Sequence, residues 1–330
     1  MKKIKIGTRG SKLALWQANL VKERIEDNFK DIKCEIVPIK TTGDKFFDMR
    51  LFEQSDKGFF TKEIEEALIK GEIDIAVHSL KDLPTEIPLE LEIGAITKRE
   101  IPNDVLISKE KKILKDLPVG AKIGTSSLRR KCQILNFRND LKIIDLRGNL
   151  DTRIRKLNTT DLDAIVIAYA GVKRLGFEDL ISEIISFEIM LPAIGQGALG
   201  IEVRKGDEKI YNIIKNLNHK ESFQAVSAER SFLRRMHGGC RIPIGAYGYI
   251  NNNTLTLEGM ISNLDGTKII RRRIQGKIEE AELIGIKLAE EILNSGGKEI
   301  LEDLKSQITN KKGVEAQKKI ENKNFKSKEI

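Results

Sequence analysis

The feature that most constrains the fold is a short pattern that the chain contains twice. The sequence KIGT occurs at residues 5–8 and again at 122–125, and each copy runs into a serine-bearing turn that opens a helical pattern. The apolar segment DIAV at 74–77 is similarly echoed by DAIV at 163–166. Short apolar runs that alternate with helical patterns are typical of strands in α/β units. We therefore expect two similar α/β lobes that face each other across a cleft, each with a helix start that can bind an anion.

The order of these patterns also indicates how the chain is divided. We expect a first domain from residues 1–98 and 196–217, because the glycine-punctuated segment 191–205 reads as an extra strand that returns the chain to the first lobe. Residues 99–195 are expected to form the second lobe, which is rich in arginine. Two crossings between the lobes would make a hinge, and Gln196 lies at the second crossing.

From residue 218 the pattern changes to α+β. A long helix is followed by three strands and a closing amphipathic helix, at 242–250, 254–263, 268–276 and 279–297. We expect a third, small domain over 218–307 with a three-stranded antiparallel sheet, and a closing helix that stops at Gly296 and Gly297. The expected fold class is therefore α/β, with two periplasmic-binding-protein-like lobes around a cleft plus this third domain. The Lys-rich tail, residues 308–330, lacks apolar periodicity and is expected to be disordered.

The composition of the chain indicates its cellular compartment and the kind of partner it binds. The chain has 330 residues and a net charge of +9, and residues 311–330 alone carry seven Lys and three Glu. Aromatic residues make up only 5%, so the basic excess suits small anionic ligands better than a nucleic acid. Cys34, Cys132 and Cys240 are odd in number and show no paired spacing, which favours a reducing compartment. No segment has the length of a membrane span or the apolar core of a signal peptide, so we expect a cytoplasmic protein.

Polar side chains gather where the central strand of the first lobe ends. The stretch AVHSLKDLP, residues 76–84, brings together His78, Ser79, Lys81 and Asp82 directly after an apolar run. In open α/β sheets ligands bind at the carboxyl ends of the strands, so this stretch is a candidate for chemistry. Taken alone, it also fits an ordinary solvated turn.

Arginines gather in a comparable way on the second lobe. They follow strands or begin helices, at Arg129, Arg130, Arg147, Arg153 and Arg174. The strand KIIDLRG is expected to run as far as Arg147. In the first lobe, Arg9 lies in a glycine-containing loop and Ser11 is expected to cap the following helix. A basic solvated surface is the alternative, but the arginine fork is a natural partner for carboxylates, which favours a ligand with many of them.

Two further segments are candidates for function. Residues 43–60 show no clean periodicity, and we interpret them as a lid or binding loop with Lys57 at its far end. Cys240 follows two glycines and is flanked by basic residues, a setting that favours the thiolate and makes it a candidate nucleophile or attachment point. The histidines and cysteines show no ligand spacing, so we expect no metal.

Several of these segments resemble one family of proteins. The resemblance rests on seven motifs in order: RGSKLALWQ (9–17), KGFFTKEIE (57–65), AVHSLKDLP (76–84), IGTSSLRR (123–130), LRGNLDTR (146–153), IGQGALG (194–200) and GGCRIPIGA (238–246). They look like the signatures of porphobilinogen deaminase, also called hydroxymethylbilane synthase. The likeness runs from residue 4 to about residue 300 and does not cover the tail. Arg241 stands where the family frequently has a neutral polar residue.

This resemblance implies an activity and a cofactor. It implies a three-domain transferase of tetrapyrrole (haem) biosynthesis that condenses four porphobilinogens head to tail into linear hydroxymethylbilane and releases ammonia. It also implies one dipyrromethane cofactor per chain, held by a thioether to Cys240. The partner is then a small molecule, with no nucleic acid or membrane involved, and the protein is expected to be monomeric.

The resemblance also implies roles for individual residues. Asp82, Arg9 and Lys81 resemble the catalytic residues, and Lys57 resembles a lid residue. The residues that resemble those holding cofactor and substrate carboxylates are Ser11, Gln17, Ser79, Thr125, Ser127, Arg129, Arg130, Arg147, Arg153, Arg174 and Gln196.

Two rival hypotheses stay open on the sequence. A two-lobed anion receptor without catalysis would share the fold, but it explains neither the cysteine loop nor the third domain. A nucleic-acid binder is suggested by the isoelectric point near 9.2, although much of the Lys excess is concentrated in the tail.

Overall fold

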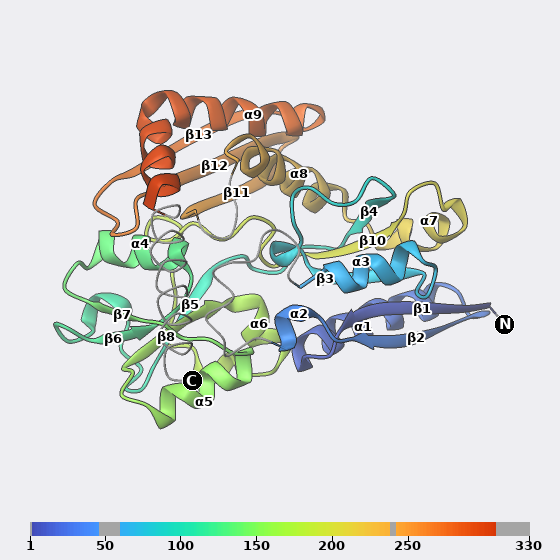
Figure 1. The fold of residues 1–330 in the computed structure, drawn as a ribbon, viewed down its shortest axis with the longest axis horizontal. Helices are drawn as coiled ribbons and strands as arrows, with labels where there is room; N and C mark the ends of the chain where they lie inside the picture. Colours follow the sequence, from blue (N-terminus) through green and yellow to red (C-terminus); the bar gives the residue numbers. More distant parts are fainter. Residues whose placement is uncertain (1, 46–59, 238–241, 308–330) are drawn as a thin grey trace, which may run out of the picture.

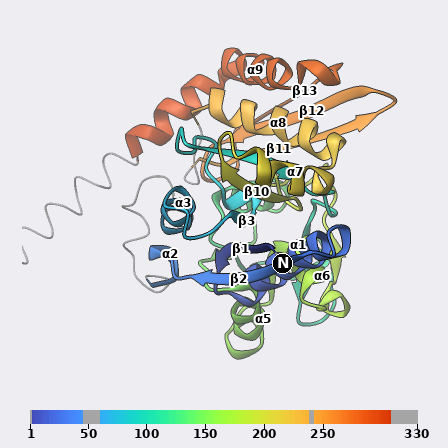
Figure 2. The ribbon, with the colours of Figure 1, turned by 90° about the vertical axis from the view of Figure 1, so that its right-hand side faces the viewer.

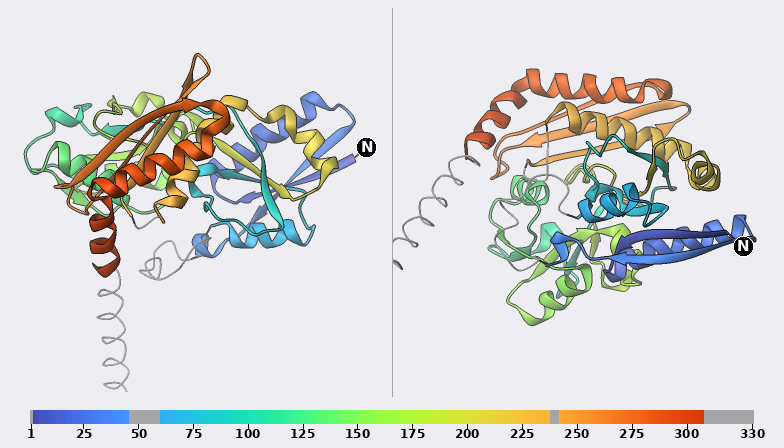
Figure 3. Two further views of the ribbon diagram at one scale, coloured as in Figure 1. Left: turned by 90° about the horizontal axis from the view of Figure 1, so that it is seen from above. Right: turned by 45° about the vertical axis from the view of Figure 1, so that its right-hand side comes forward.

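The computed structural model describes residues 2–45, 60–237 and 242–307. In this part of the chain the strands form two five-stranded sheets and one three-stranded sheet. Figure 1 shows the first lobe on the right, the second lobe on the left and the third domain above both. The right-hand view of Figure 3 shows the same arrangement, with the third domain resting on the two lobes.

The first sheet has the order β2-β1-β3-β10-β4. The elements of this lobe are β1 (Lys2–Arg9), α1 (Lys12–Asn28), β2 (Ile32–Ile39), α2 (Thr42–Lys45), α3 (Lys62–Ile69), β3 (Ile75–Ser79), a 3₁₀ turn (Leu80–Asp82), β4 (Leu91–Ile96), β10 (Leu199–Arg204), α7 (Glu208–Ile214) and a second 3₁₀ turn (Lys215–Leu217). Strand β1 is parallel to β2 and β3, whereas β10 is antiparallel to both β3 and β4. The returning segment is thus an inserted strand of the first sheet, as its sequence predicts.

The second sheet repeats this plan with the order β7-β6-β8-β5-β9. Its lobe contains β5 (Asp104–Ser108), a 3₁₀ turn (Leu114–Asp116), β6 (Lys122–Gly124), α4 (Leu128–Phe137), β7 (Lys142–Ile144), α5 (Leu150–Thr159), β8 (Ala164–Ala168), α6 (Tyr169–Arg174), a 3₁₀ turn (Glu178–Leu180) and β9 (Glu183–Ile184). Strand β6 is parallel to β7 and β8, and β5 is antiparallel to β8 and β9. The two KIGT segments occupy equivalent strands, β1 and β6, which confirms two similar lobes.

The third domain is a three-stranded antiparallel sheet with two helices. It consists of α8 (Lys220–Arg235), β11 (Ile244–Asn251), β12 (Thr254–Ser262), β13 (Ile269–Lys277), a 3₁₀ turn (Ile278–Glu280), α9 (Ala281–Ile292) and a kinked segment (Leu293–Gly297). The strand order is β11-β12-β13. Its core includes Phe232 of α8 and Leu288 of α9, which pack on β12 at Gly259. Figure 2 shows α9 at the outer edge and α8 beneath it, towards the first lobe. The fold class expected from the sequence is confirmed.

One local expectation was wrong and another was confirmed. Strand β7 ends at Ile144, so Arg147 lies three residues beyond it. The closing helix breaks at its glycines, as expected: Ser295 and Gly296 depart from helical dihedral angles, with a φ of 102° at Gly296, and a separate helical segment follows over 298–307. This continuation buries Ile300, Leu301 and Leu304 in the third domain, and that apolar burial favours its packing there.

The lobes and the third domain meet at Glu229 of α8, which is fully buried. Its carboxylate accepts hydrogen bonds from Arg99 Nη1 and Nη2 at 2.5 and 3.2 Å. It also accepts from the backbone N–H groups of Gly195 and Gly248, at 2.7 and 2.8 Å. Arg99 and Gly195 lie in the two segments that connect the lobes. Glu229 of α8 therefore hydrogen-bonds to both connecting segments. The domain boundaries drawn from the sequence stay a prediction.

Candidate active site

The end of β3 places Lys81 and Asp82 beside the second lobe. The 3₁₀ turn Leu80–Asp82 follows the strand directly, and the Leu80 N–H donates to the Ala198 carbonyl at 3.1 Å. Leu80 is buried against Gly200, where an added Cβ would lie 2.6 Å from Leu80 Cδ1. Leu80 therefore anchors the turn, while Asp82 is exposed and Lys81 is half-buried.

The same five-residue sequence, LKDLP, occurs a second time at 114–118 and supplies an internal comparison. It also forms a 3₁₀ turn, Leu114–Asp116, with its first leucine buried. Lys115 and Asp116 of this copy are both exposed. Any difference between the two copies therefore comes from their surroundings and not from local sequence.

The surroundings of Lys81 are strongly cationic. Burial lowers the pKa of Lys81 to about 8, Asp82 and Asp104 oppose this shift, and Arg130 and Arg129 add to it. Lys81 makes no hydrogen bond or ion pair with any other residue that the structure describes. An ammonium group that has lost water without gaining an anionic partner is a ready site for a carboxylate.

The first helix contributes polar groups next to this turn. Ser11 caps α1 by accepting from the Ala14 N–H at 3.3 Å, as predicted. Gln17 is buried, and its side-chain amide both donates to and accepts from the Ser79 hydroxyl, at 2.8 and 3.0 Å. The Arg9 guanidinium carbon lies 4.2 Å from the centre of the Phe60 ring.

The helix start of the second lobe has a similar design. Ser127 caps α4 by accepting from the Arg130 N–H at 3.4 Å. The Thr125 hydroxyl accepts from the Ser127 N–H at 3.3 Å, and Thr125 itself is buried. The two hydroxyl groups therefore shape the turn that presents the following arginines.

Those arginines share one buried carboxylate, Asp104. Arg129 Nη1 lies 2.7 Å from Asp104 Oδ2, and Arg130 Nη2 and Nε lie 2.7 and 3.1 Å from Oδ1. Gln196 Nε2 donates to the same Oδ1 at 3.0 Å. Burial by itself raises the pKa of the Asp104 carboxyl, but the guanidiniums of Arg129 and Arg130 outweigh it and hold the pKa well below its usual range. Asp104 was missed from the sequence, where it reads only as the first residue of an apolar strand.

Three more arginines lie at the edge of this region. Arg153 Nε donates to the Gly148 carbonyl at 2.8 Å, and burial together with Arg130 lowers the pKa of Arg153 to about 10 while Asp82 opposes the shift. Arg147 lies 3.7 Å from Asp145.

The third of them, Arg174, links the two lobes. Its Nη2 group donates to the Gly197 carbonyl at 2.6 Å, and its guanidinium carbon lies 6.0 Å from the centre of the Trp16 ring. Burial lowers the pKa of Arg174 to about 10, against the effect of Glu100.

The charge of this cluster fits an anionic ligand. The cluster contains four cationic side chains and only two carboxylates. The cations are Lys81, Arg129, Arg130 and Arg153, which influence one another's pKa values or pair with Asp104, and the carboxylates are Asp82 and Asp104. Desolvated cations in excess are costly unless anions accompany them. The donor set therefore suits a ligand that carries several carboxylates.

Other candidates lie elsewhere or do not fit. His78 is buried and pairs with Glu202 of β10 at 3.1 Å, so it does not join Lys81 and Asp82. Lys57 and Cys240 lie outside the described residues. Within 2–45, 60–237 and 242–307, there is no cluster of possible metal ligands and no helix that could cross a membrane.

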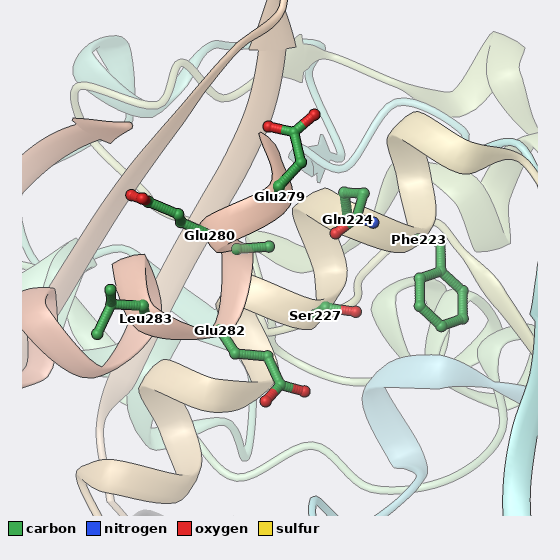
Figure 4. Close-up of a pocket in the computed structure, with 8 residues that line it drawn as sticks. Phe223, Gln224, Ser227, Glu279, Glu280, Glu282 and Leu283 are labelled. Atoms are coloured by element: carbon green, nitrogen blue, oxygen red, sulfur yellow. The ribbon is translucent and has the colours of Figure 1, made fainter. Parts of the chain in front are cut away.

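A pocket of about 450 Å³ lies between α8 and the start of α9 (Figure 4). The carboxylates of Glu279, Glu280 and Glu282 are among its lining groups. Their negative charge makes the pocket unsuitable for an anionic ligand.

Comparison with known proteins shows the family. A model described as porphobilinogen deaminase, dipyrromethane cofactor binding domain, matches residues 4–212, and one for the C-terminal domain of the same enzyme matches 223–294. The chain belongs to the porphobilinogen deaminase family. The porphobilinogen deaminase of Carboxydothermus hydrogenoformans is 51% identical over 304 residues, which cover 92% of this chain and 98% of the relative. That of Geobacter metallireducens is 52% identical over 303 residues, which cover 92% and 95%.

The family resemblance seen in the sequence is thus confirmed, together with its activity and cofactor. As a member of this family, the chain is a transferase of tetrapyrrole biosynthesis that acts on porphobilinogen and uses a dipyrromethane cofactor. Among solved structures, the methionine binding protein MetQ matches 69% of this chain and 93% of its own, at 16% identity and a TM-score of 0.39. That likeness is too weak to bear on function.

Proposed function

We propose that Asp82 is the catalytic carboxylate of this deaminase and that the cationic cluster beside it holds the carboxylates of the cofactor and the growing chain. The observation that supports this most strongly is that the half-buried Lys81, which makes no hydrogen bond or ion pair with the residues that the structure describes, lies next to the exposed Asp82 at a strand end. Every pyrrole ring of the substrate carries two carboxylates, which suits a site with excess cations.

The chemistry asks for a fixed negative charge. Loss of ammonia from porphobilinogen leaves a positive charge that the substrate ring shares with its pyrrole nitrogen. A preorganised carboxylate stabilises this charge as it develops, and Asp82 is placed to do so. If Asp82 starts as the carboxylic acid, it can pass its proton to the leaving amine and is then left as this carboxylate. When bound, the dipyrromethane supplies the terminal pyrrole to which the first substrate ring is joined.

The surrounding residues are proposed to bind and orient. Arg129 uses Nη1 on Asp104 and on the Leu191 carbonyl, so its Nε and Nη2 groups keep donors for a ligand. Lys81 and Arg153 are further carboxylate partners, and Arg9 is proposed to act with them at the substrate.

The rest of the proposed carboxylate-binding set borders these residues or supports them through the turns and hydrogen bonds described above. Its members are Ser11, Gln17, Ser79, Thr125, Ser127, Arg130, Arg147, Arg174 and Gln196.

Two proposals concern residues outside the part of the chain that the structure describes. The cofactor is proposed to be joined to Cys240 by a thioether, and Lys57 to belong to a lid. Cys34 and Cys132 are buried, and burial raises the pKa of each thiol to about 11, which keeps them unreactive and leaves Cys240 as the candidate. We also propose a cytoplasmic monomer that binds neither nucleic acid nor membrane.

The test is Asp82→Asn, which keeps the shape of the side chain and removes its charge. We expect the fold and the cofactor content to be retained and kcat to fall by about 10²–10³, the usual cost of losing one preorganised group. The measurement is the rate of hydroxymethylbilane formation, with the cofactor content followed by intact mass. Asp116→Asn is a matched control, because Asp116 lies in the second LKDLP turn. Wild-type turnover in Asp82→Asn would remove Asp82 from its role.

A further inference from the structure

A buried arginine of the third domain holds the turn that carries Asp82. Arg230 of α8 is 7% exposed. Its Nη1 group donates to the Leu83 carbonyl at 3.0 Å, and its Nη2 group donates to the Pro84 carbonyl at 2.5 Å. These carbonyls belong to the two residues that follow Asp82, so one guanidinium grips the backbone as it leaves the catalytic turn.

The contact needs an arginine. Two neighbouring carbonyls present two acceptors, and the planar guanidinium fork can bind both at once, whereas an ammonium group is a single point of charge. Backbone carbonyls that lie in the protein interior need such donors. Burial, helped by Arg234, lowers the pKa of Arg230 to about 10 against the effect of Glu202, so the side chain stays charged at neutral pH despite its surroundings.

Apolar packing joins the same two elements. Leu80 and Leu83 of the turn form a buried cluster with Val226 of α8, and Phe223 packs against it. Val226 and Arg230 are four residues apart and so lie on the same side of the helix. The turn thus rests on α8 through its side chains and is fixed to α8 through its backbone.

The helix also leads to the proposed attachment point. It ends at Arg235, and Cys240 follows five residues later. The helix that contacts the turn presenting Asp82 therefore lies close in sequence to Cys240.

We propose that Arg230 is a positioning residue for the reaction: it fixes the backbone after Asp82 and so sets the position of this carboxylate from the third domain. The proposal rests on the role of Asp82 proposed above. A shift of about 1 Å at a catalytic group can cost about 10²-fold in rate, so a hydrogen bond outside the reacting centre can govern kcat.

The experiment compares Arg230→Gln, Arg230→Lys and Arg230→Ala with the loaded wild-type enzyme. We expect full cofactor content by intact mass, a kcat lowered by about 10- to 100-fold and a KM changed by less than about threefold. Guanidinium ion should restore part of the kcat of Arg230→Ala, because it can occupy the vacated site. Arg234→Gln is the matched control, since Arg234 is exposed one turn further along the same helix.

A double variant separates this proposal from that for Asp82. If Arg230 acts through Asp82, Asp82→Asn/Arg230→Gln is no slower than Asp82→Asn alone. Losses that multiply in the double variant would overturn the positioning role, as would wild-type kcat in Arg230→Gln or a loss explained by missing cofactor. Wild-type activity of Asp82→Asn alone would overturn the proposed role of Asp82, and the positioning role of Arg230 with it, whereas wild-type kcat in Arg230→Gln beside an impaired Asp82→Asn would overturn the role of Arg230 alone.

Discussion

Asp104→Asn tests whether one carboxylate holds the arginine cluster together. Asp104 has no exposed surface and accepts from both Arg129 and Arg130 at 2.7 Å. The substitution keeps the size of the side chain and removes its charge, which leaves two buried guanidinium groups without a counter-charge. Breaking a buried ion pair from one side costs about 3–5 kcal/mol in the free energy of unfolding. At about 2–4 °C per kcal/mol, the melting temperature should fall by roughly 10 °C.

The assay is thermal and denaturant unfolding of the loaded enzyme, repeated at lower pH. Because the pKa of folded Asp104 is depressed, its stabilisation is fully present above the pKa of the unfolded chain, about 4, and is lost as pH falls through the lower folded value. The stability difference between the wild type and Asp104→Asn should therefore shrink in acid.

Asp140→Asn is the control for this comparison. Asp140 pairs with Arg138 at 2.6 Å, but both side chains are partly open to solvent, so the loss should be much smaller. A change of less than about 1 kcal/mol in Asp104→Asn, or one equal to that in Asp140→Asn, would refute the claim that Asp104 neutralises the cluster.

Two further predictions follow from the same structure. Because the pKa of Lys81 is lowered to about 8, its acylation should be half-maximal near pH 8 in cofactor-free Cys240→Ser and at higher pH in the loaded enzyme, where bound carboxylates raise this pKa. Peptide mass spectrometry measures the acylation, with Lys115 as control. Equal pH profiles for Lys81 in the two enzyme forms would contradict the prediction. Gly266→Ala should lower the melting temperature more than Gly206→Ala. The two glycines have nearly the same φ, +76° and +78°, but only a Cβ at 266 would collide with a backbone carbonyl of α4; equal losses of melting temperature would show that the hairpin does not pack tightly on α4.

The duplicated fold could be predicted because repeated local patterns determine it. Strands β1 and β6 and the caps Ser11 and Ser127 are encoded by short apolar runs and by residues next to them. The family motifs likewise mark the end of β3 in the sequence.

The character of the site could not be predicted in the same way. LKDLP occurs twice and forms the same turn twice. Only the lysine of the first copy, Lys81, lies close enough to Arg129, Arg130 and Asp104 for these residues to change its pKa. That difference depends on residues far apart in the chain. The Arg230 guanidinium likewise binds the carbonyls of Leu83 and Pro84, which precede it by 147 and 146 residues in the sequence. No local pattern indicates this contact.

The central claim is that an oligopyrrole anchored through sulfur is held beside Asp82 by an excess of cations. Its most direct test is the intact mass of the purified protein, measured for the wild type and for Cys240→Ser under denaturing conditions. We expect the wild-type mass to exceed that of the chain by one dipyrromethane and Cys240→Ser to have the mass of the chain alone. An unmodified wild type, or an adduct that persists in Cys240→Ser, would contradict it.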